Sequence, residues 1–459
     1  RAIASQLTTT QVVVGFDMRL SSEDLEKALV NGFLEAGVDV VRIGRVTTPM
    51  FYYAMYSGTS TAGVMITASH NPKDYNGFKI TLENAKPLYK ENGLFELKNF
   101  MHKEKWTSVR QRFGHVIKKD IKRRYTRFFS RVAPALTSEF SIITDTGNGV
   151  GSLELDVLNE IYGHHVTMTR LCDTIDGNMP HHEANPIKKS EMKELSLAVA
   201  QSDVDFGIGL DGDADRVVFF LSDGTMVPPD MMTALLTTQV TDKNDTVVVD
   251  VRSSKAVTNY ITAQSRAPRL SIAGHAYIKD VMKTDNAPFG GEKSGHFFYR
   301  TLHYTDSTLW TILQLLHLLD KTGQSLDELA RPLMEEYISE GEKNYTVTKK
   351  DETLRALKKE FETDCEIKTI DGVSAYNEDY FFEEYRNHYG RSYLEDFESI
   401  KKMGARRVSI INRVHRRSGV ATAHTPRLLD VGCAYGPFLL AAAEAGYQPE
   451  GLDVAGAAG

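Results

Sequence analysis

Cysteine is scarce in this chain: Cys172, Cys365 and Cys433 are the only three among 459 residues, and they form no CxxC or zinc-type spacing. This scarcity argues against a disulfide framework or a structural metal, and we expect a cytoplasmic location. No apolar run approaches the roughly 18 residues that a membrane helix needs, so we expect no membrane association. An excess of positive charge is also missing. With 61 acidic and 54 basic residues the net charge is −7, which argues against a nucleic-acid partner.

The composition that is present, 41% hydrophobic and 25% charged residues, is typical of a globular protein. At about 150 residues per domain, the length predicts three domains or four small ones. Val12 to Val14 predicts a buried strand, and Ser21 with Asp24 forms a capping-box pattern that opens a helix. Val38 to Ile43 predicts the next strand. This β-α-β order indicates an α/β layer.

Two further α/β units follow the first. One begins with a strand at Ser141 to Ile143 and runs to a strand at Phe206 to Leu210, and the other begins with a strand at Thr246 to Val251. Between the first two units, Met101 to Arg131 is rich in Lys and Arg. This segment is either a basic patch for an anionic substrate or a solvated helix that links two domains. The chain therefore uses one architectural theme three times.

The sharpest local signal is Asp211-Gly212-Asp213-Ala214-Asp215-Arg216, directly after an apolar strand. Three carboxylates at alternate positions repel one another unless a hard divalent cation neutralises them, which favours a Mg²⁺ site. An EF-hand loop is excluded, because its sixth position is Arg216 and its twelfth is Ser222. An acidic turn with Asp caps is the alternative.

Two polar loops also follow strands. In Thr67 to Pro72, Ser69 is a candidate nucleophile or phosphoryl carrier, and the alternative is an Asn-Pro turn with a capping serine. The context is not Gly-x-Ser-x-Gly, which disfavours a serine hydrolase. In Gly290 to His296, Glu292 and Ser294 alternate on a glycine-flanked loop that suits the hydroxyls of a sugar. A plain surface loop is the alternative there.

Taken together and in this order, the three loops resemble those of the α-D-phosphohexomutase superfamily, in the form of its phosphomannomutase/phosphoglucomutase branch. The resemblance covers about residues 1 to 375. Supporting matches are Val14-Gly15-Phe16-Asp17-Met18-Arg19, Gly274-His275 and Thr369-Ile370-Asp371-Gly372-Val373. The resemblance implies an α/β fold with four domains around a central cleft.

The same resemblance implies an enzyme that interconverts hexose 6-phosphate and hexose 1-phosphate, with mannose or glucose as the sugar. A phosphorylated Ser69 would give its phosphoryl group to the substrate and form a bisphosphorylated sugar. Hexose 1,6-bisphosphate would be the activator, and we expect a monomer or weak oligomer. The implied Mg²⁺ ligands are Ser69, Asp211, Asp213 and Asp215. The implied catalytic residues are Ser69, His70, Arg216 and His296, and the implied substrate-binding residues are Arg252, His275, Glu292, Ser294 and His296.

The last quarter departs from this family. Members carry an Arg-x-Ser-x-Thr-Glu-Pro-like phosphate clamp in the fourth domain, but no Thr-Glu-Pro follows Arg416-Arg417-Ser418-Gly419 here. An early Gly-Ile-Arg-Gly-like loop is also missing, so we expect the natural start to lie upstream. With Leu429 to Gly436 as its first motif, the segment 377–459 resembles the start of a class I S-adenosylmethionine-dependent methyltransferase. The cofactor-binding residues that this second resemblance implies are Asp430, Gly432, Gly436 and Asp453.

These observations predict three successive phosphohexomutase-type α/β domains around a cleft, a truncated fourth domain and a partial Rossmann-like methyltransferase segment. The predicted bounds are 1–132, 133–238, 239–338, 339–376 and 377–459. A mutase is the leading hypothesis. The alternatives are an impaired or chimeric product that binds Mg²⁺ and sugar phosphate without turnover, and a methyltransferase carried by the tail.

Overall fold

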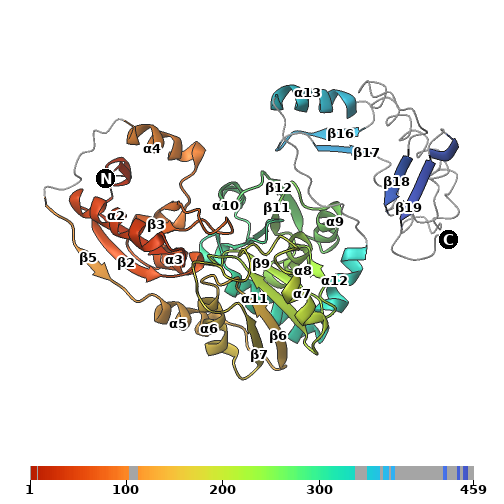
Figure 1. Ribbon diagram of the computed structural model, residues 1–459, viewed down its shortest axis with the longest axis horizontal. Coiled ribbons are helices and arrows are strands. Elements are labelled where there is room, and N and C mark those ends of the chain that lie inside the picture. Colours follow the sequence, from red (N-terminus) through yellow and green to blue (C-terminus); the bar gives the residue numbers. More distant parts are fainter. Residues whose placement is uncertain are drawn as a thin grey trace. The chain divides into compact units, whose positions relative to one another are not determined.

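The computed structural model divides into two units, Arg1–Tyr345 and Thr346–Gly459 (Figure 1). Each unit is taken by itself below. The residues described are 2–7, 9–102, 112–335, 349–361, 365–371, 374–377, 427–431, 442–444 and 448–452. Within this part of the chain, no helix has the length and hydropathy needed to cross a membrane.

The first sheet has the strand order β4-β3-β1-β2-β5, with β4 antiparallel to β3 and the other neighbours parallel. Its strands are β1 (Gln11–Phe16), β2 (Asp39–Arg45), β3 (Ala62–Ile66), β4 (Phe78–Leu82) and β5 (Val116–Lys118). Its helices are α1 (Ala2–Leu7), α2 (Ser22–Glu35), α3 (Thr48–Tyr56) and α4 (Leu94–Met101). The predicted β-α-β order is confirmed.

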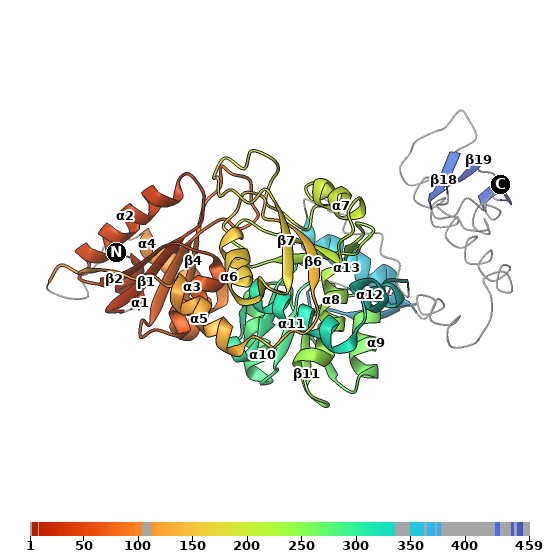
Figure 2. The same cartoon turned by 90° about the horizontal axis from the view of Figure 1, so that it is seen from below.

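Alternation along β1 decides which helix covers which face of this sheet. Successive side chains of a strand point to opposite faces. Val12 and Val14 pack in one core cluster with Phe33 of α2, whereas Val13 packs in another with Phe51 of α3. Figure 2 shows α2 and α3 on opposite sides of the sheet. Both faces are therefore buried, as an α/β layer requires.

The capping-box prediction at Ser21 is wrong. Ser21 has helical backbone angles, φ −80 and ψ −10, and its side chain makes no capping bond. Its hydroxyl instead accepts a hydrogen bond from Asn76 Nδ2 at 2.9 Å, and Ser22 Oγ donates to Asp17 Oδ1 at 2.7 Å. These contacts with residues outside the helix replace the local cap.

The second and third sheets have the orders β10-β9-β8-β6-β7 and β12-β11-β13-β14-β15. The strands of the second are β6 (Phe140–Asp145), β7 (Val166–Leu171), β8 (Phe206–Leu210), β9 (Val217–Phe220) and β10 (Met226–Val227). Those of the third are β11 (Thr246–Asp250), β12 (Ala267–Ser271), β13 (Phe289–Gly291), β14 (Phe297–Tyr299) and β15 (Thr305–Asp306). The helices of this region are α5 (Lys122–Val132), α6 (Ser152–Tyr162), α7 (Lys193–Ala200), α8 (Pro229–Val240), α9 (Lys255–Ala263), α10 (His275–Thr284), α11 (Thr308–Thr322) and α12 (Leu326–Glu335). Short 3-10 turns are η1 (Glu83–Ala85), η2 (Lys90–Asn92) and η3 (Arg300–Leu302).

One topology recurs in all three sheets. The first strand in sequence lies between the second and the third, parallel to both, and the fourth returns antiparallel beside the third. The repeated architectural theme is thereby confirmed. The loops that join third to fourth strands are 67–77, 211–216 and 292–296, so each of the three loops singled out in the sequence occupies the same position in its own domain.

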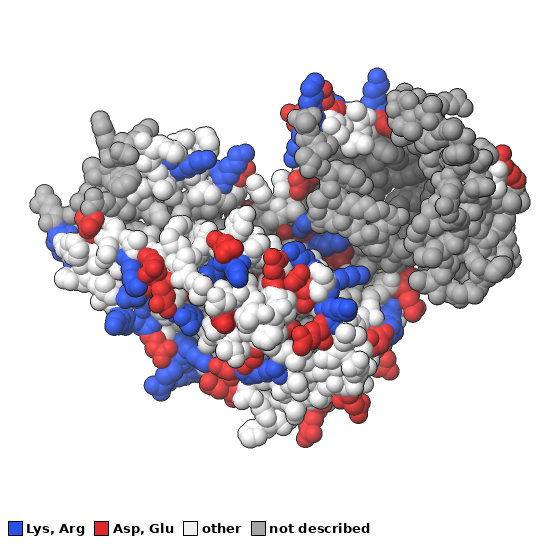
Figure 3. Space-filling view, in the orientation of Figure 1, with Lys and Arg blue, Asp and Glu red and all other residues white. Residues whose placement is uncertain are grey.

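The C-terminal part of the basic segment Met101 to Arg131 forms α5, and residues 103–111 of it fall outside the described residues. Arg123, Arg124, Arg127 and Arg131 on it are exposed, while Tyr125 is buried. Around α5, blue and red side chains are intermixed on the face shown in Figure 3. This favours the interpretation as a solvated linking helix.

The second unit contains α13 (Lys350–Phe361), the antiparallel pair β16 (Cys365–Lys368) and β17 (Ser374–Asn377), and the parallel pair β18 (Arg427–Val431) and β19 (Gln448–Leu452). Of the predicted S-adenosylmethionine contacts, Asp430 lies on β18, and Gly432, Gly436 and Asp453 fall outside the described residues. The methyltransferase resemblance and the exact domain bounds stay predictions.

A buried ion pair joins the end of β6 to the loop 172–192. His182 Nε2 lies 3.1 Å from Oδ2 of Asp145, which is fully buried, and Cys172 completes a group whose ligand atoms lie within 4.8 Å of one another. Burial of the ring lowers the pKa of His182, but the hydrogen bond and charge of Asp145 outweigh this effect and raise the pKa to about 9. At neutral pH the group therefore contains an ion pair between His182 and Asp145.

This pair makes stability depend on pH. Because the folded pKa of His182 lies above its ordinary value of 6.5, the stabilisation is complete below about pH 6.5 and is lost as pH rises through about 9. We expect His182→Gln to flatten the fall in unfolding free energy between these pH values. Urea unfolding at several pH values measures it, with exposed His164→Gln as control. Equal slopes in His182→Gln and wild type would contradict the assignment.

Candidate active site

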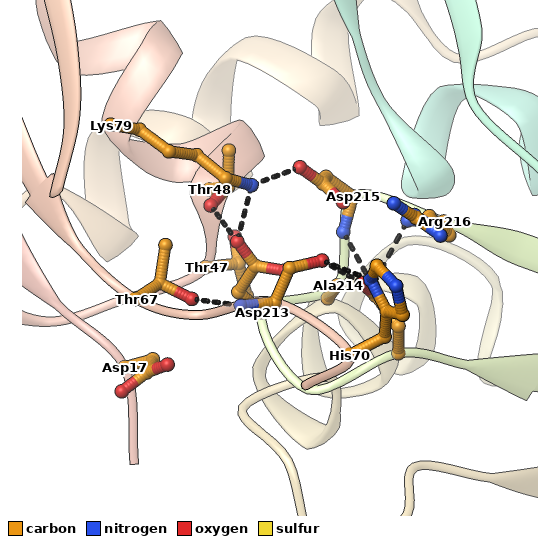
Figure 4. A network of polar contacts seen from close by, with 12 residues as sticks. Asp17, Thr47, Thr48, Thr67, His70, Lys79, Asp213, Ala214, Asp215 and Arg216 are labelled. Carbon is orange, nitrogen blue, oxygen red and sulfur yellow. Dashed lines mark hydrogen bonds and ion pairs between the residues drawn. The ribbon is translucent and has the colours of Figure 1, made fainter. Parts of the chain in front are cut away.

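Three buried carboxylates form the centre of the site. Asp211 and Asp213 are 0% exposed and Asp215 is 2% exposed, and their oxygens lie within 4.8 Å of one another. Lys79, which comes from β4 of the first domain, donates to Asp213 Oδ2 at 2.6 Å and also to Asp215 Oδ2 (Figure 4). Thr48 Oγ1 donates to the same Asp213 oxygen at 2.5 Å. A cation and a hydroxyl from the first domain thus reach the acidic loop of the second.

Charge among these groups is balanced by their neighbours. Burial raises the pKa of Asp211 well above its usual range, and the charges of Asp215 and Asp213 raise it further. Burial also acts to raise the pKa of Asp215, but the charges of Lys79, His296 and Arg216 together outweigh it and the pKa falls. The two carboxylates in turn hold the pKa of Lys79 well above its ordinary value, against the effect of burial. Lys79 is therefore a cation at neutral pH.

The nucleophile candidate lies against this centre. Ser69 Oγ donates to Asp211 Oδ2 at 2.7 Å, although the two residues are 142 positions apart in sequence. Asp211 Oδ1 accepts from the backbone N–H groups of Asp215 and Arg216, both at 3.0 Å, which fixes the carboxylate within its loop. Ser69 has φ +50, a conformation that non-glycine residues seldom adopt. The strained backbone aims its hydroxyl at the carboxylates.

Gly212 makes this approach possible. A Cβ at this position would lie 2.7 Å from the backbone oxygen of Ser69 and 3.1 Å from Cε of Met18. Real Cβ atoms do not come that close to backbone, so any side chain here would separate the two loops. The glycine of the acidic motif therefore serves the contact between domains.

Arg19 holds the loop 67–77, which carries Ser69, through hydrogen bonds to its backbone. Its guanidinium is 1% exposed and donates to four backbone oxygens of the loop. The acceptors are those of Ser69 at 2.8 Å, Asn71 at 2.6 Å, Pro72 at 2.7 Å and Tyr75 at 2.8 Å. Asp17 pairs with Arg19 Nε at 3.2 Å, and Ser69 N donates to Thr67 Oγ1 at 2.8 Å. These five hydrogen bonds to or within the loop leave Ser69 little freedom.

A histidine and an arginine link the acidic loop to the third domain. Arg216 Nε donates to His296 Nε2 at 3.0 Å. Because a guanidinium can only donate, His296 Nε2 accepts and its Nδ1 carries the proton, which it shares with Asp306 Oδ2 at 2.8 Å. Asp306 also accepts from buried Lys279 at 3.0 Å. This network fixes the tautomer of His296 and places Arg216 beside the carboxylates.

His70 is the imidazole nearest to Ser69, with 3.3 Å between Nδ1 and Ser69 Oγ. Burial lowers the pKa of His70, and the charge of Arg216 lowers it further, to about 4. The ring is therefore neutral at neutral pH and able to accept a proton.

The third loop presents polar groups of the kind that bind a sugar. Glu292 is 6% exposed and accepts from Arg252 Nη2 at 3.1 Å, while Arg252 also pairs with Asp250. Ser294 Oγ and His275 Nδ1 are buried atoms without a hydrogen-bond partner among the described residues. A ligand hydroxyl would satisfy such atoms.

The carboxylate group fits Mg²⁺. Asp213 Oδ1 and Asp215 Oδ1 are buried and accept no hydrogen bond within the described part of the chain. Hard carboxylate oxygens are the donors that Mg²⁺ prefers, and buried anions need a cation close by. The predicted ligands therefore lie together, with Ser69 beside them.

Several residues of the site escaped the sequence analysis. Lys79, Thr48 and Asp306 lie on elements that gave no motif of their own. One signal for Lys79 is its position on β4, where a lysine stands opposite Met65 of the buried strand β3. The contact of Thr48 with Asp213 depends on how two domains pack. Those of Asp306 with Lys279 and His296 depend on the tertiary fold of the third domain, and no local pattern encodes either.

Comparison with known proteins agrees with this geometry. Family models for phosphoglucomutase/phosphomannomutase, alpha/beta/alpha domains I, II and III, match residues 1–108, 123–224 and 228–337. A phosphoglucomutase of Neisseria gonorrhoeae is 33% identical over 387 residues, which cover 81% of this chain and 82% of that protein. A phosphomannomutase of Methanocaldococcus jannaschii is 30% identical over 390 residues, 83% of this chain and 84% of that protein.

A solved structure gives the same answer for the fold. The crystal structure of a phosphoglucomutase/phosphomannomutase family protein from Burkholderia thailandensis superposes with a TM-score of 0.70 at 26% identity. The match covers 82% of this chain and 83% of that one. Three domain models in order, long relatives and a shared fold lead to one conclusion: this chain belongs to the phosphoglucomutase/phosphomannomutase family.

Proposed function

We propose that this chain is a phosphohexomutase that interconverts hexose 6-phosphate and hexose 1-phosphate through a phosphorylated Ser69. The contact between Ser69 Oγ and Asp211 Oδ2, at 2.7 Å, is the observation that supports it most strongly. It puts the hydroxyl of one domain against the carboxylates of the next, where a phosphoryl group and its counter-ion would share one position. Phosphoryl transfer depends chiefly on such positioning and charge neutralisation.

The chain's own residues supply most of the machinery. Bound by Asp211, Asp213, Asp215 and an oxygen on Ser69, Mg²⁺ would supply positive charge beside the transferring group. Arg216, held by His296, adds a second positive charge on the adjacent side.

Proton transfer falls to an imidazole close to Ser69. A sugar hydroxyl gives its proton to neutral His70, and its oxygen forms a bond to phosphorus as the bond from phosphorus to Ser69 Oγ breaks. His70, whose Nδ1 lies 3.3 Å from Ser69 Oγ, then passes the proton to that oxygen. The product is a bisphosphorylated sugar. Transfer of its other phosphoryl group back to Ser69 completes the cycle.

The sugar-binding loop supports a hexose as substrate. Glu292, Ser294 and His275 present a carboxylate, a hydroxyl and an imidazole that can pair with ring hydroxyls in either orientation of the sugar. Arg252, next to Glu292, would pair with a phosphate oxygen. Added hexose 1,6-bisphosphate would phosphorylate Ser69 and act as the activator.

We expect Ser69→Ala to abolish turnover, on the order of a thousand-fold or more, because it removes the phosphoryl carrier. A coupled assay with Mg²⁺, glucose 1,6-bisphosphate and mannose 1-phosphate or glucose 1-phosphate measures it. Ser130→Ala, on the exposed face of α5, is the matched control. A folded wild-type protein without turnover, or a fully active Ser69→Ala, would refute the proposal.

Gly212→Ala tests the contact between the loops and leaves every functional side chain in place. The added methyl would displace the Ser69 backbone, and we expect kcat to fall roughly a hundred-fold because misplacement by about 1 Å costs that much. Thermal unfolding accompanies the assay. The contact is irrelevant to turnover if kcat stays at the wild-type value.

A further inference from the structure

A buried carboxylate outside the reaction centre is not explained by the proposed chemistry. Glu154, in the first turn of α6, is 0% exposed. It accepts hydrogen bonds from Thr47 Oγ1 and from Tyr125 OH, the latter at 3.0 Å. Burial raises its pKa to about 7, although both hydrogen bonds act to lower it. Burying a carboxylate costs free energy unless its partners compensate it, so the partners of Glu154 indicate its role.

The first partner leads directly to the acidic loop. Thr47 is the N-cap of α3, and its side chain accepts from Met50 N at 3.1 Å. The next residue, Thr48, donates through Oγ1 to Asp213 Oδ2 at 2.5 Å and through its backbone N–H to Asp213 O at 2.9 Å. Glu154 thus fixes Thr47, and the next residue, Thr48, holds Asp213. Figure 4 shows Thr47 and Thr48 beside the carboxylate of Asp213.

The second partner leads to the same loop by another path. The hydroxyl of Tyr125 also contacts the side chain of Ser307, which caps α11 by accepting from Trp310 N at 3.2 Å. The residue after that cap, Thr308, donates to Ala214 O at 2.9 Å. Two helix N-termini from different domains therefore hold adjacent residues of the acidic loop, and Glu154 connects to the caps of both.

We propose that Glu154 is a positioning residue, which orients the Asp213 carboxylate toward the metal by holding the Thr47 cap of α3. This inference deepens the mutase assignment and depends on it for its catalytic readout. The role needs an acceptor for two hydroxyl donors at once. A carboxylate meets that need, and an amide does not, because its nitrogen can only donate.

The test compares Glu154→Gln with Glu160→Gln, which alters an exposed glutamate on the same helix. Calorimetric titration with Mg²⁺ and the coupled assay are run on both, with thermal unfolding alongside. For Glu154→Gln we expect Mg²⁺ affinity to fall several-fold and kcat roughly tenfold, with KM for the sugar phosphate within about twofold. Glu160→Gln stays at wild-type values.

Variants at Thr47 keep the proposal testable if Glu154→Gln does not fold. We expect Thr47→Val, which removes the hydroxyl donor to Glu154, to reproduce the loss of Mg²⁺ affinity. Thr47→Ser keeps the hydroxyl, so its Mg²⁺ affinity equals that of the wild type. In the double variant Glu154→Gln with Thr47→Val, the two losses of Mg²⁺ affinity do not multiply. Both substitutions break the same hydrogen bond, the one from Thr47 to Glu154.

Wild-type Mg²⁺ affinity in both Glu154→Gln and Thr47→Val overturns the proposal, and so do losses that multiply. If the wild-type protein binds Mg²⁺ but turns over no sugar phosphate, the mutase assignment fails while Mg²⁺ affinity still decides the role of Glu154. Absence of Mg²⁺ binding by the wild-type protein overturns both.

Discussion

The carboxylates of Asp211, Asp213 and Asp215 repel one another, and the other groups of the site are arranged to offset this repulsion. Three buried carboxylates within five consecutive residues cannot all stay ionised without positive charge nearby. Lys79 supplies one charge from another domain, and Thr48 adds a hydrogen bond from the same domain. Because these compensating groups come from outside the loop, the acidic centre can form only when the domains are packed together. The arrangement of the acidic centre therefore depends on packing between domains.

The repeated topology explains why the three functional loops meet. In each domain the parallel part of the sheet ends at the third strand, and the chain turns back into an antiparallel neighbour. The connecting loop emerges at the carboxyl end of that strand, the edge at which open α/β sheets bind ligands. In the mutase that we propose, each copy contributes one function there: a nucleophile, a set of metal ligands and a set of sugar contacts. The direct bonds from Ser69 to Asp211 and from Arg216 to His296 join the three.

The sequence allowed the three loops to be predicted because each is a short, contiguous pattern at the end of an apolar strand. It did not reveal Lys79, Thr48 or Glu154, each of which has a partner more than 100 positions away. The capping box at Ser21 failed for the related reason that tertiary hydrogen bonds with Asn76 displaced a local one. Local chemistry is readable from one chain, whereas compensation of buried charge depends on how domains pack.

Single-turnover transfer of phosphate is the most direct measurement. The protein is first labelled on Ser69 with a hexose 1,6-bisphosphate that carries radioactive phosphate. The labelled protein is then mixed with Mg²⁺ and a stoichiometric amount of unlabelled hexose 1-phosphate. The account predicts that label leaves the protein and appears in hexose bisphosphate and then in hexose 6-phosphate. Label that stays on the protein, or that is released only as inorganic phosphate, would contradict the central claim that Ser69 and the three aspartates form a phosphoryl-transfer centre.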